Sequence, residues 1–267
     1  MTIEKSASRP AEEPLNPTEL ACFERDGFLI QRGLADKARC EALAAIVDAS
    51  LNPALAPLEY EADVHYPGAP DSREAQGGLT PRRLLHAYTR HPLFREWAGS
   101  EAVVSRLRQL MHSREILLSQ NHHNCIMTKH PGFSSMTSWH EDVRYWSFDR
   151  PELVSVWLAL GQESAVNGGM QLIPGTHRAT FDRGRLDAAL FLRTDLAENQ
   201  TLIDSAVEAD LQAGDVLFFH CKTYHAAGKN SSDTVKRSLV FTYRTPDNRP
   251  IPSTRSGFYQ DVPVGGK

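Results

Sequence analysis

The stretch Trp139-His140-Glu141-Asp142 places an imidazole and a carboxylate two residues apart. In an extended segment, side chains two residues apart point to the same side. His140 and Asp142 can therefore be aimed at one point, while Glu141 points away from it. One histidine from a distant part of the chain would complete a 2-His-1-carboxylate facial triad, which leaves open positions on a ferrous ion.

Outward from this motif, the chain is patterned as short strands separated by turns. The strand-like runs are residues 116–118, 121–128, 153–160, 169–173, 216–219 and 238–243. Helical patterns come first: one after the start Asn16-Pro17, one after Asp36, and one over residues 91–111 with a break near Gly99. Helices followed by many short strands predict an α+β chain whose strands form a sandwich or barrel.

The same pattern gives the expected domain organisation. Residues 1–15 are mostly polar and predict a disordered lead-in. Residues 16–267 predict one domain, because a β-sandwich or barrel of this length usually forms a single unit. Residues 59–80, rich in glycine, proline and charge, predict a long loop of the kind that is functional or disordered. Residues 178–200 interrupt the strand series and predict an insertion over one end of the barrel.

Composition excludes several classes of protein. The 267 residues carry a formal net charge of −4, so we expect no nucleic-acid partner and no adhesion to membranes. The four cysteines are widely spaced without a Cys-x-x-Cys pair, which predicts reduced thiols in a cytosolic protein. No apolar signal core or spanning helix is evident, so the expected location is the cytoplasm. No feature indicates an oligomeric state.

Two histidines, His220 and His225, compete for the third ligand position. His220 follows an apolar strand-like run and could be a satisfied core histidine. His225 is followed by small residues and Gly228, which let a backbone and a ligand approach closely. His225 is therefore the preferred third ligand.

A basic pair, Lys236-Arg237, enters a strand-like run about a dozen positions after His225. A facial-triad oxygenase must also hold the distal carboxylate of its oxo-acid co-substrate, and a guanidinium can do so with bidentate geometry. The alternative interpretation of the pair is a solvated strand end.

Short motifs follow one another over residues 17–245. They are Asp26-Gly27-Phe28-Leu29, Lys129 with Pro131, His140-x-Asp142, Trp157, Asn167-Gly168, Ile173-Pro174-Gly175-Thr176-His177, Gly214-Asp215, and His225 to Asn230. Their order resembles that of the phytanoyl-CoA dioxygenase family. The resemblance implies an enzyme that uses iron(II), 2-oxoglutarate and O2, on a double-stranded β-helix (jelly-roll, cupin-like) core with N-terminal helices packed outside. It also implies that His140, Asp142 and His225 bind the iron and that Trp157 borders the 2-oxoglutarate pocket.

The chain departs from the family pattern at the co-substrate pocket. Counting without gaps from His225 places the family's 2-oxoglutarate-binding arginine on Lys236, with Arg237 as its neighbour. Strand alternation then puts Lys236 inward and Arg237 outward, whereas a one-residue bulge would reverse them. The chemistry favours Arg237, the spacing favours Lys236, and we lean slightly to Arg237. Ala227 stands where some members have a serine that contacts the co-substrate.

Other residues are candidates for the pocket walls. His123, Cys125 and Met127 alternate on one strand face, which either lines the same pocket or packs inside the barrel. Just after the iron motif, four residues combine aromatic surface with one cation: Arg144, Tyr145, Trp146 and Phe148. With the loop at 59–80 and the insertion at 178–200, these are expected to form the mouth of the substrate pocket.

The resemblance implies hydroxylation of an unactivated C–H bond in a small organic molecule, or a desaturation or ring-forming variant. The presence of Asp142 disfavours halogenation, because related halogenases carry a small residue there. We expect a substrate from secondary or amino-acid metabolism; a coenzyme A thioester is not favoured, since no basic cluster suits its phosphates. Two alternatives stay open: a cupin-like metalloenzyme that does not use 2-oxoglutarate, and a catalytically silent jelly-roll binding protein.

Overall fold

The computed structural model describes residues 13–265. Residues 1–12 of the predicted lead-in lie outside the described residues. The predicted boundary at residue 15 is wrong by a few positions, because Leu15 is already buried in the core and its backbone N–H donates to Gln109 Oε1.

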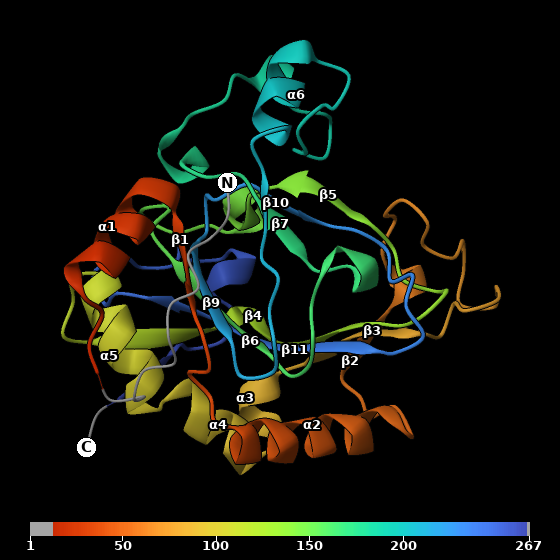
Figure 1. The fold of residues 1–267 in the computed structure, drawn as a ribbon, viewed down its shortest axis with the longest axis horizontal. Helices are drawn as coiled ribbons and strands as arrows, with labels where there is room; N and C mark the ends of the chain where they lie inside the picture. The colour runs from red at the N-terminus through yellow and green to blue at the C-terminus, as the bar shows by residue number, and fades with distance from the viewer. Residues whose placement is uncertain (1–12, 266–267) are drawn as a thin grey trace.

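Two antiparallel sheets form the centre of the molecule, as Figure 1 shows. The larger sheet has the order β1-β9-β6-β11-β4-β3-β2, with β12 also paired to β4, and the smaller one has the order β5-β10-β7-β8. The strands of the larger sheet are β1 (Phe28–Gln31), β2 (Leu58–Tyr60), β3 (Pro81–Leu85), β4 (Ile116–Lys129), β6 (Val154–Ala159), β9 (Val216–His220), β11 (Lys236–Arg244) and β12 (Val262–Val264). Those of the smaller sheet are β5 (Thr137–His140), β7 (Met170–Leu172), β8 (Val207–Glu208) and β10 (His225–Ala227). This arrangement confirms the predicted jelly-roll core.

The helices begin and end where the sequence signals predict. α1 (Pro17–Asp26) begins with a capping box between Asn16 and Glu19 and ends at Gly27, whose φ of 82° suits glycine. α2 (Lys37–Leu51) is capped by the Asp36 side chain. The expected break near Gly99 separates α4 (Pro92–Ala98) from α5 (Glu101–Leu110). The remaining helices are α3 (Ala87–Arg90), α6 (Ala197–Ile203) and the 3₁₀ turns η1 (Glu61–Asp63), η2 (Asp142–Tyr145), η3 (Ala165–Asn167), η4 (Thr176–Arg178), η5 (Arg183–Arg185) and η6 (Arg255–Gly257).

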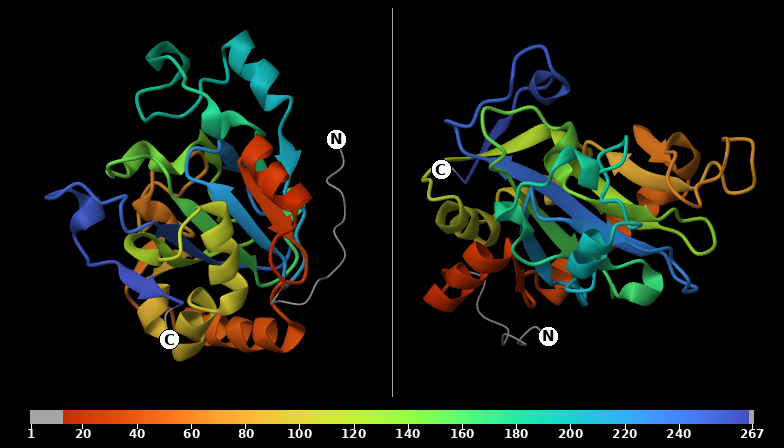
Figure 2. Two further views of the ribbon diagram at one scale, coloured as in Figure 1. Left: turned by 90° about the vertical axis from the view of Figure 1, so that its left-hand side faces the viewer. Right: turned by 90° about the horizontal axis from the view of Figure 1, so that it is seen from above.

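Side chains alternate along the strands between the face that the helices cover and the space between the two sheets. α2 and α4 cover the outer face of the larger sheet, and α6 lies on the far side of the smaller one (Figures 1 and 2). Leu239, Phe241 and Tyr243 of β11 are buried in the cluster under the helices, whereas Val240 packs between the two sheets. Each such fully buried apolar side chain stabilises the fold by roughly 1.5–3 kcal/mol.

β4 carries a wide bulge that shapes the interior. Its partners on β11 jump from Phe241↔Asn124 to Thr242↔Ser119, so residues 120–123 have no partner on that strand. The two runs expected at 116–118 and 121–128 are therefore one strand, interrupted in the middle. A bulge bends a strand and re-aims its side chains, and this one lies beside the site described below.

The predicted loop and the predicted insertion are both present, and their limits differ from the predicted ones. The loop at 59–80 begins within β2 and contains η1 before β3 starts at Pro81. The insertion at 178–200 contains η5 and most of α6, which runs on to Ile203.

Within residues 13–265, no helix combines the length and the apolar character needed to cross a membrane.

Candidate active site

Three side chains from separate elements meet between the sheets. His140 ends β5, Asp142 begins η2, and His225 begins β10, directly opposite His140 in the sheet register. Glu141 between the first two is extended (φ −103°, ψ 145°), so its neighbours face the same side. Asp142 Oδ1 lies 3.8 Å from His140 Nε2 and 3.7 Å from His225 Nε2.

The hydrogen bond that Nδ1 of each imidazole makes determines which nitrogen faces Asp142. His140 Nδ1 lies 2.8 Å from the Ser138 carbonyl, and His225 Nδ1 lies 2.9 Å from the Thr223 carbonyl. A carbonyl only accepts, so both Nδ1 atoms carry a proton, and the two Nε2 atoms are the ones that face Asp142. Burial lowers the pKa of His140 well below its usual value, which keeps the ring a neutral ligand.

These residues fit a divalent metal ion. One ligand atom from each of His140, Asp142 and His225 lies within 4.8 Å of the others, and all three residues are buried. Asp142 Oδ2 is also buried and has no hydrogen-bond partner among the described residues. A buried carboxylate without a donor is costly unless a cation compensates it. The donor set of two imidazoles and one carboxylate is the one that suits non-haem iron(II).

A cavity of about 250 Å³ opens from the triad. Of the predicted co-substrate residues, Trp157, Ala227 and Lys236 line it, and so does His123, whose Nδ1 lies 3.5 Å from Asp142 Oδ2. Arg144, Tyr145 and Trp146 line it too, as expected for the substrate end. Of the two roles left open for Cys125, the structure favours packing inside the barrel, because the residue is buried in the apolar cluster between the sheets and is not part of the cavity wall.

The preference for Arg237 is wrong. The β11–β4 register is regular from Lys236 to Phe241, so no bulge reverses the alternation. Arg237 shares the outer face with Leu239 and forms an ion pair with Asp48 of α2. Lys236 shares the inner face with Ser238 and lines the cavity, with its side chain 3% exposed. The helices that cover the outer face decide which of the two basic residues points inward.

Glu163 is a residue of this site that the sequence reasoning missed. Its carboxylate accepts hydrogen bonds from Ser238 Oγ (2.6 Å), Trp157 Nε1 (3.1 Å to Oε2) and Lys236 Nζ (3.1 Å). The Lys236 ammonium also lies 4.9 Å from the centre of the Trp157 ring. Glu163 thus fixes the positions of the cation and the indole at one end of the cavity. No motif marks it, because two of its three partners, Lys236 and Ser238, are 73 and 75 residues away in the chain.

Lys129 is a second lysine on the cavity wall, opposite Lys236 in the strand register. Its Nζ donates to the carbonyls of Ser135 and Gly228, each at 2.7 Å. Burial, followed by the charge of Lys236, lowers the pKa of Lys129 to about 7.

Two segments meet around Arg144 at the edge of the cavity. Arg144 Nη2 donates to Tyr66 Oη in the loop at 59–80 (3.2 Å), and Nη1 donates to the Ala189 carbonyl in the insertion (3.3 Å). The guanidinium lies 3.8 Å from the centre of the Phe191 ring, and that ring contacts His140 edge-on at 5.8 Å. Arg144 thus links the loop at 59–80 to the insertion at 178–200 beside the cavity, through Tyr66 and Phe191, two residues that the sequence did not reveal.

The rejected ligand, His220, lies outside the site. Its Nδ1 accepts a hydrogen bond from the Lys222 backbone N–H at 3.1 Å, and its ring faces His177 at 5.5 Å. Burial, then the charges of His177 and Lys222, lower the pKa of His220 to about 4.

The lowered pKa of His220 predicts that the folded protein loses stability in acid. Above pH 6.5, His220 is neutral in both the folded and the unfolded chain. As the pH falls from 6.5 to 4, the unfolded chain gains a proton that the folded chain does not, and roughly 3 kcal/mol of stability is lost. In His220→Asn, the amide oxygen can accept from Lys222 without titrating. Urea unfolding of metal-free protein at pH 7 and pH 4.5 should show a smaller loss for the variant, and equal losses would contradict this account.

A jelly roll with two histidines and one carboxylate at one point defines the class of mononuclear non-haem iron oxygenases. The model of the phytanoyl-CoA dioxygenase (PhyH) family matches residues 23–238, and the chain belongs to this family of iron(II)- and 2-oxoglutarate-dependent oxygenases. The protein is thus an oxidoreductase that uses iron, 2-oxoglutarate and O2.

Individual relatives are more distant. Ectoine dioxygenase of Halomonas elongata is 26% identical, covering 90% of this chain and 73% of its own. A probable alpha-ketoglutarate-dependent hypophosphite dioxygenase of Stutzerimonas stutzeri is 24% identical, over 73% and 69% of the two chains. EctD from S. alaskensis, solved with 2-oxoglutarate and 5-hydroxyectoine, superposes with a TM-score of 0.74 at 16% identity (98% and 90% covered). The carbocyclase SnoK from nogalamycin biosynthesis gives 0.73 at 18% (97% and 100% covered).

Proposed function

We propose that the protein hydroxylates, or otherwise oxidises, an unactivated C–H bond of a small organic molecule, with His140, Asp142 and His225 as the iron ligands. The observation that carries the proposal is the convergence of the two Nε2 atoms on Asp142, whose buried Oδ2 accepts no hydrogen bond from the described residues. Iron, when bound there, would activate O2 with electrons from the oxidative decarboxylation of 2-oxoglutarate to succinate and carbon dioxide.

The protein's own contribution is binding, orientation and exclusion of water. Lys236, held by Glu163 and Ser238, offers its ammonium to the distal carboxylate of 2-oxoglutarate, and Trp157 forms the wall beside it. Phe191 covers the His140 side of the triad. Arg144 ties the two loops of the mouth together, which would keep bulk water from the reacting atoms.

The cavity supports a small substrate. A volume of about 250 Å³ that must hold 2-oxoglutarate as well as the substrate favours a small molecule. Two relatives are named for ectoine and hypophosphite, and both of these molecules are small and polar. We therefore infer a small polar metabolite, in secondary or amino-acid metabolism.

The test is an anaerobic titration of the purified protein with iron(II) and then 2-oxoglutarate. We expect the weak visible charge-transfer band of the iron–2-oxoglutarate chelate, at one equivalent of each. Succinate release in air, scored over a panel of small metabolites, would then identify the substrate. A soluble, metal-loaded protein that gives neither band nor succinate would disprove the proposal and favour a cupin-like enzyme or a silent binding protein.

Arg144 gives a separate prediction about the mouth. Arg144→Met removes the donor to Tyr66 and leaves the Ala189 carbonyl with only its longer contact from Tyr145 Oη, at 3.4 Å, so we expect a protease to cleave within residues 178–200 several-fold faster than in the unmodified protein. Arg249→Met, which changes an exposed arginine outside the cavity wall, should leave the cleavage rate unchanged. Equal rates for all three proteins would show that Arg144 does not hold the mouth closed.

A further inference from the structure

Two lysines face the cavity at the triad from neighbouring strands. Lys129, at the end of β4, lies directly opposite Lys236 of β11 in the antiparallel register. Residues paired in this way have their side chains on the same face of the sheet, with Cβ atoms about 4.5–5.5 Å apart. Both lysines line the cavity. The register therefore brings a second ammonium group to the end of the cavity that we assign to the distal carboxylate of 2-oxoglutarate.

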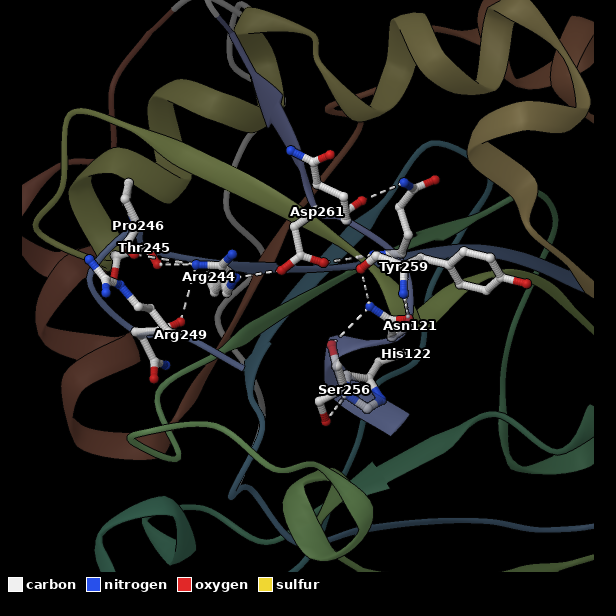
Figure 3. Close-up of polar contacts among 12 residues, drawn as sticks. Asn121, His122, Arg244, Thr245, Pro246, Arg249, Ser256, Tyr259 and Asp261 are labelled. Carbon is white, nitrogen blue, oxygen red and sulfur yellow. Dashed lines mark hydrogen bonds and ion pairs between the residues drawn. The ribbon is translucent and has the colours of Figure 1, made fainter. Parts of the chain in front are cut away.

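The strand that carries Lys129 is held in place on both sides of its bulge. Residues 124–129 pair regularly with β11. The bulge itself is fastened by Asn121, whose Nδ2 donates to the carbonyls of Ser256 (2.9 Å) and Tyr259 (2.7 Å), as Figure 3 shows. The irregularity in the middle of β4 therefore does not reach Lys129.

An ammonium group has three N–H donors, and Lys129 uses two of them within the protein. Its Nζ donates to the carbonyls of Ser135 and Gly228, each at 2.7 Å. Both acceptors are neutral, and within residues 13–265 no aspartate or glutamate forms an ion pair with this lysine. One N–H group and an uncompensated positive charge are left for a ligand.

Lys236 has one free N–H group as well. Its Nζ lies 3.1 Å from Glu163 Oε2 and 3.2 Å from Ser238 Oγ, which uses two of its three donors. A single N–H group binds one carboxylate oxygen, whereas a guanidinium can bind both oxygens at once. The second oxygen of a distal carboxylate therefore needs another donor, and the side chain of Ala227, on the same cavity wall, offers none.

The charges around Lys129 favour an anion beside it. Like charges that face each other across a strand pair are destabilising. Glu163 compensates Lys236, but Lys129 is exposed to the positive charges of Lys236 on β11 and Arg82 on β3. The carboxylate of Glu61 in η1 acts in the opposite direction. Burial and then the two positive charges lower the pKa of Lys129 to about 7, so the free protein holds this proton weakly.

Gly168 leaves the space that the Lys129 side chain occupies. A Cβ atom at Gly168 would lie 2.6 Å from Lys129 Cδ and 2.6 Å from the Gly228 carbonyl oxygen, and the φ of Gly168 is +76°. Only glycine suits both the close approach and the left-handed backbone. The Asn167-Gly168 turn therefore fixes the path of the lysine along the cavity wall.

We propose that Lys129 is a second anchor for the distal carboxylate of 2-oxoglutarate, so that each of the two carboxylate oxygens is held by one lysine. This inference rests on the proposed function, because it assigns a further residue to the same co-substrate site. Lys129 and Lys236 together supply the two N–H groups that a single arginine supplies with its planar fork. The carboxylate in turn supplies the negative charge that the two facing ammonium groups need.

This arrangement makes the affinity for 2-oxoglutarate depend on pH. Below about pH 7, Lys129 is protonated in the free protein. Above that pH, binding must be accompanied by uptake of a proton, because the bound carboxylate raises the pKa of the ammonium. We therefore expect the Kd for 2-oxoglutarate to rise several-fold between about pH 6.5 and pH 8.5, with close to one proton taken up per molecule bound at the higher pH.

The experiment is isothermal titration calorimetry of 2-oxoglutarate into the anaerobic, iron(II)-loaded protein at both pH values, in two buffers of different ionisation enthalpy. Lys129→Met keeps the length of the side chain, and should raise the Kd at least about tenfold at the lower pH and abolish the proton uptake. Lys229→Met is the matched control, because it makes the same change at an exposed lysine next to Gly228 that is not part of the cavity wall. It should bind 2-oxoglutarate like the unmodified protein, with the same proton uptake.

A second ligand separates the loss of an anchor from damage to the site, since Lys129→Met also removes the hydrogen bonds to Ser135 and Gly228. 2-Oxopentanoate has the same metal-chelating end and the same number of carbon atoms as 2-oxoglutarate, but a methyl group replaces the distal carboxylate. Its Kd should be the same for Lys129→Met and the unmodified protein, and it should bind without proton uptake. Equal losses of affinity for both ligands would show that Lys129 only shapes the site, and would overturn the proposal.

The outcomes distinguish this proposal from the proposed function. If the unmodified protein binds 2-oxoglutarate and Lys129→Met binds it equally well, the assignment of Lys129 alone is wrong. If Lys129→Met does not fold, the unmodified protein decides, because binding at pH 8.5 without proton uptake would also overturn the second anchor. If the unmodified protein does not bind 2-oxoglutarate at either pH, both the second anchor and the proposed function are wrong.

Discussion

Replacing Asp142 with alanine is expected to abolish succinate formation and the visible band of the iron–2-oxoglutarate complex. Asp142 Oδ1 is the atom that both Nε2 atoms face, at 3.7 and 3.8 Å, and it supplies the only negative charge among the three ligands. Altering groups that merely orient metal ligands already costs about 10–100-fold in affinity. Loss of the ligand itself should therefore weaken iron binding by at least about 100-fold, measured by anaerobic titration.

Two measurements make this result interpretable. The metal-free Asp142→Ala protein should unfold at the same temperature as the unmodified protein or a higher one, because the variant removes a buried carboxylate oxygen that has no hydrogen bond. Glu141→Gln is the matched control: the residue is adjacent, but its side chain is not part of the three-residue cluster, so iron binding should be unchanged. An Asp142→Ala protein that keeps the band would refute the assignment of the triad.

Replacing Lys236 with methionine is expected to raise the Kd for 2-oxoglutarate by about 100-fold, because truncating one partner of a buried charge pair removes a charge that water cannot replace. Methionine keeps the length of the side chain and removes the ammonium that points into the cavity. Iron binding itself should persist, since Lys236 is not part of the triad. The measurement is the midpoint of the chelate band against 2-oxoglutarate concentration at saturating iron.

Arg237 provides the control for this experiment. Its ion pair with Asp48 lies on the outer face, at a site where such pairs contribute less than about 1 kcal/mol to stability. Arg237→Gln should therefore bind 2-oxoglutarate like the unmodified protein. If Arg237→Gln loses the band and Lys236→Met keeps it, the co-substrate anchor is not the residue that the strand register places inside.

Replacing Lys236 should also lower the stability of the folded protein, because Glu163 loses its counter-charge. In the Lys236→Met protein, the Glu163 carboxylate keeps its donors from Trp157 and Ser238 but loses its cation. A buried carboxylate without a counter-charge is destabilising, so this variant should also unfold at lower temperature. The double variant with Glu163→Gln should recover that stability without recovering 2-oxoglutarate affinity.

The sequence by itself determined the triad, because the information lies in local spacing. His140 and Asp142 flank a single extended residue, and the small residues after His225 distinguish it from His220. Helix starts at Asn16 and Asp36 were also predictable, since a cap is a contact over three residues. The ordered motifs then indicated the jelly-roll core.

Only the tertiary structure decided the features that depend on contacts between distant segments. The choice of Lys236 over Arg237 depends on which face of β11 the helices cover, and the spacing of two adjacent basic residues does not encode that. Glu163 and Phe191 reach the site from segments whose local patterns carry no catalytic signal. The β4 bulge meets residues 256–259 through Asn121, which is more than 130 residues from these partners in the chain. Contacts between residues a few positions apart can be predicted from the sequence. The strand register, the sheet face on which a side chain lies and the enclosure of a cavity depend instead on how the whole chain packs.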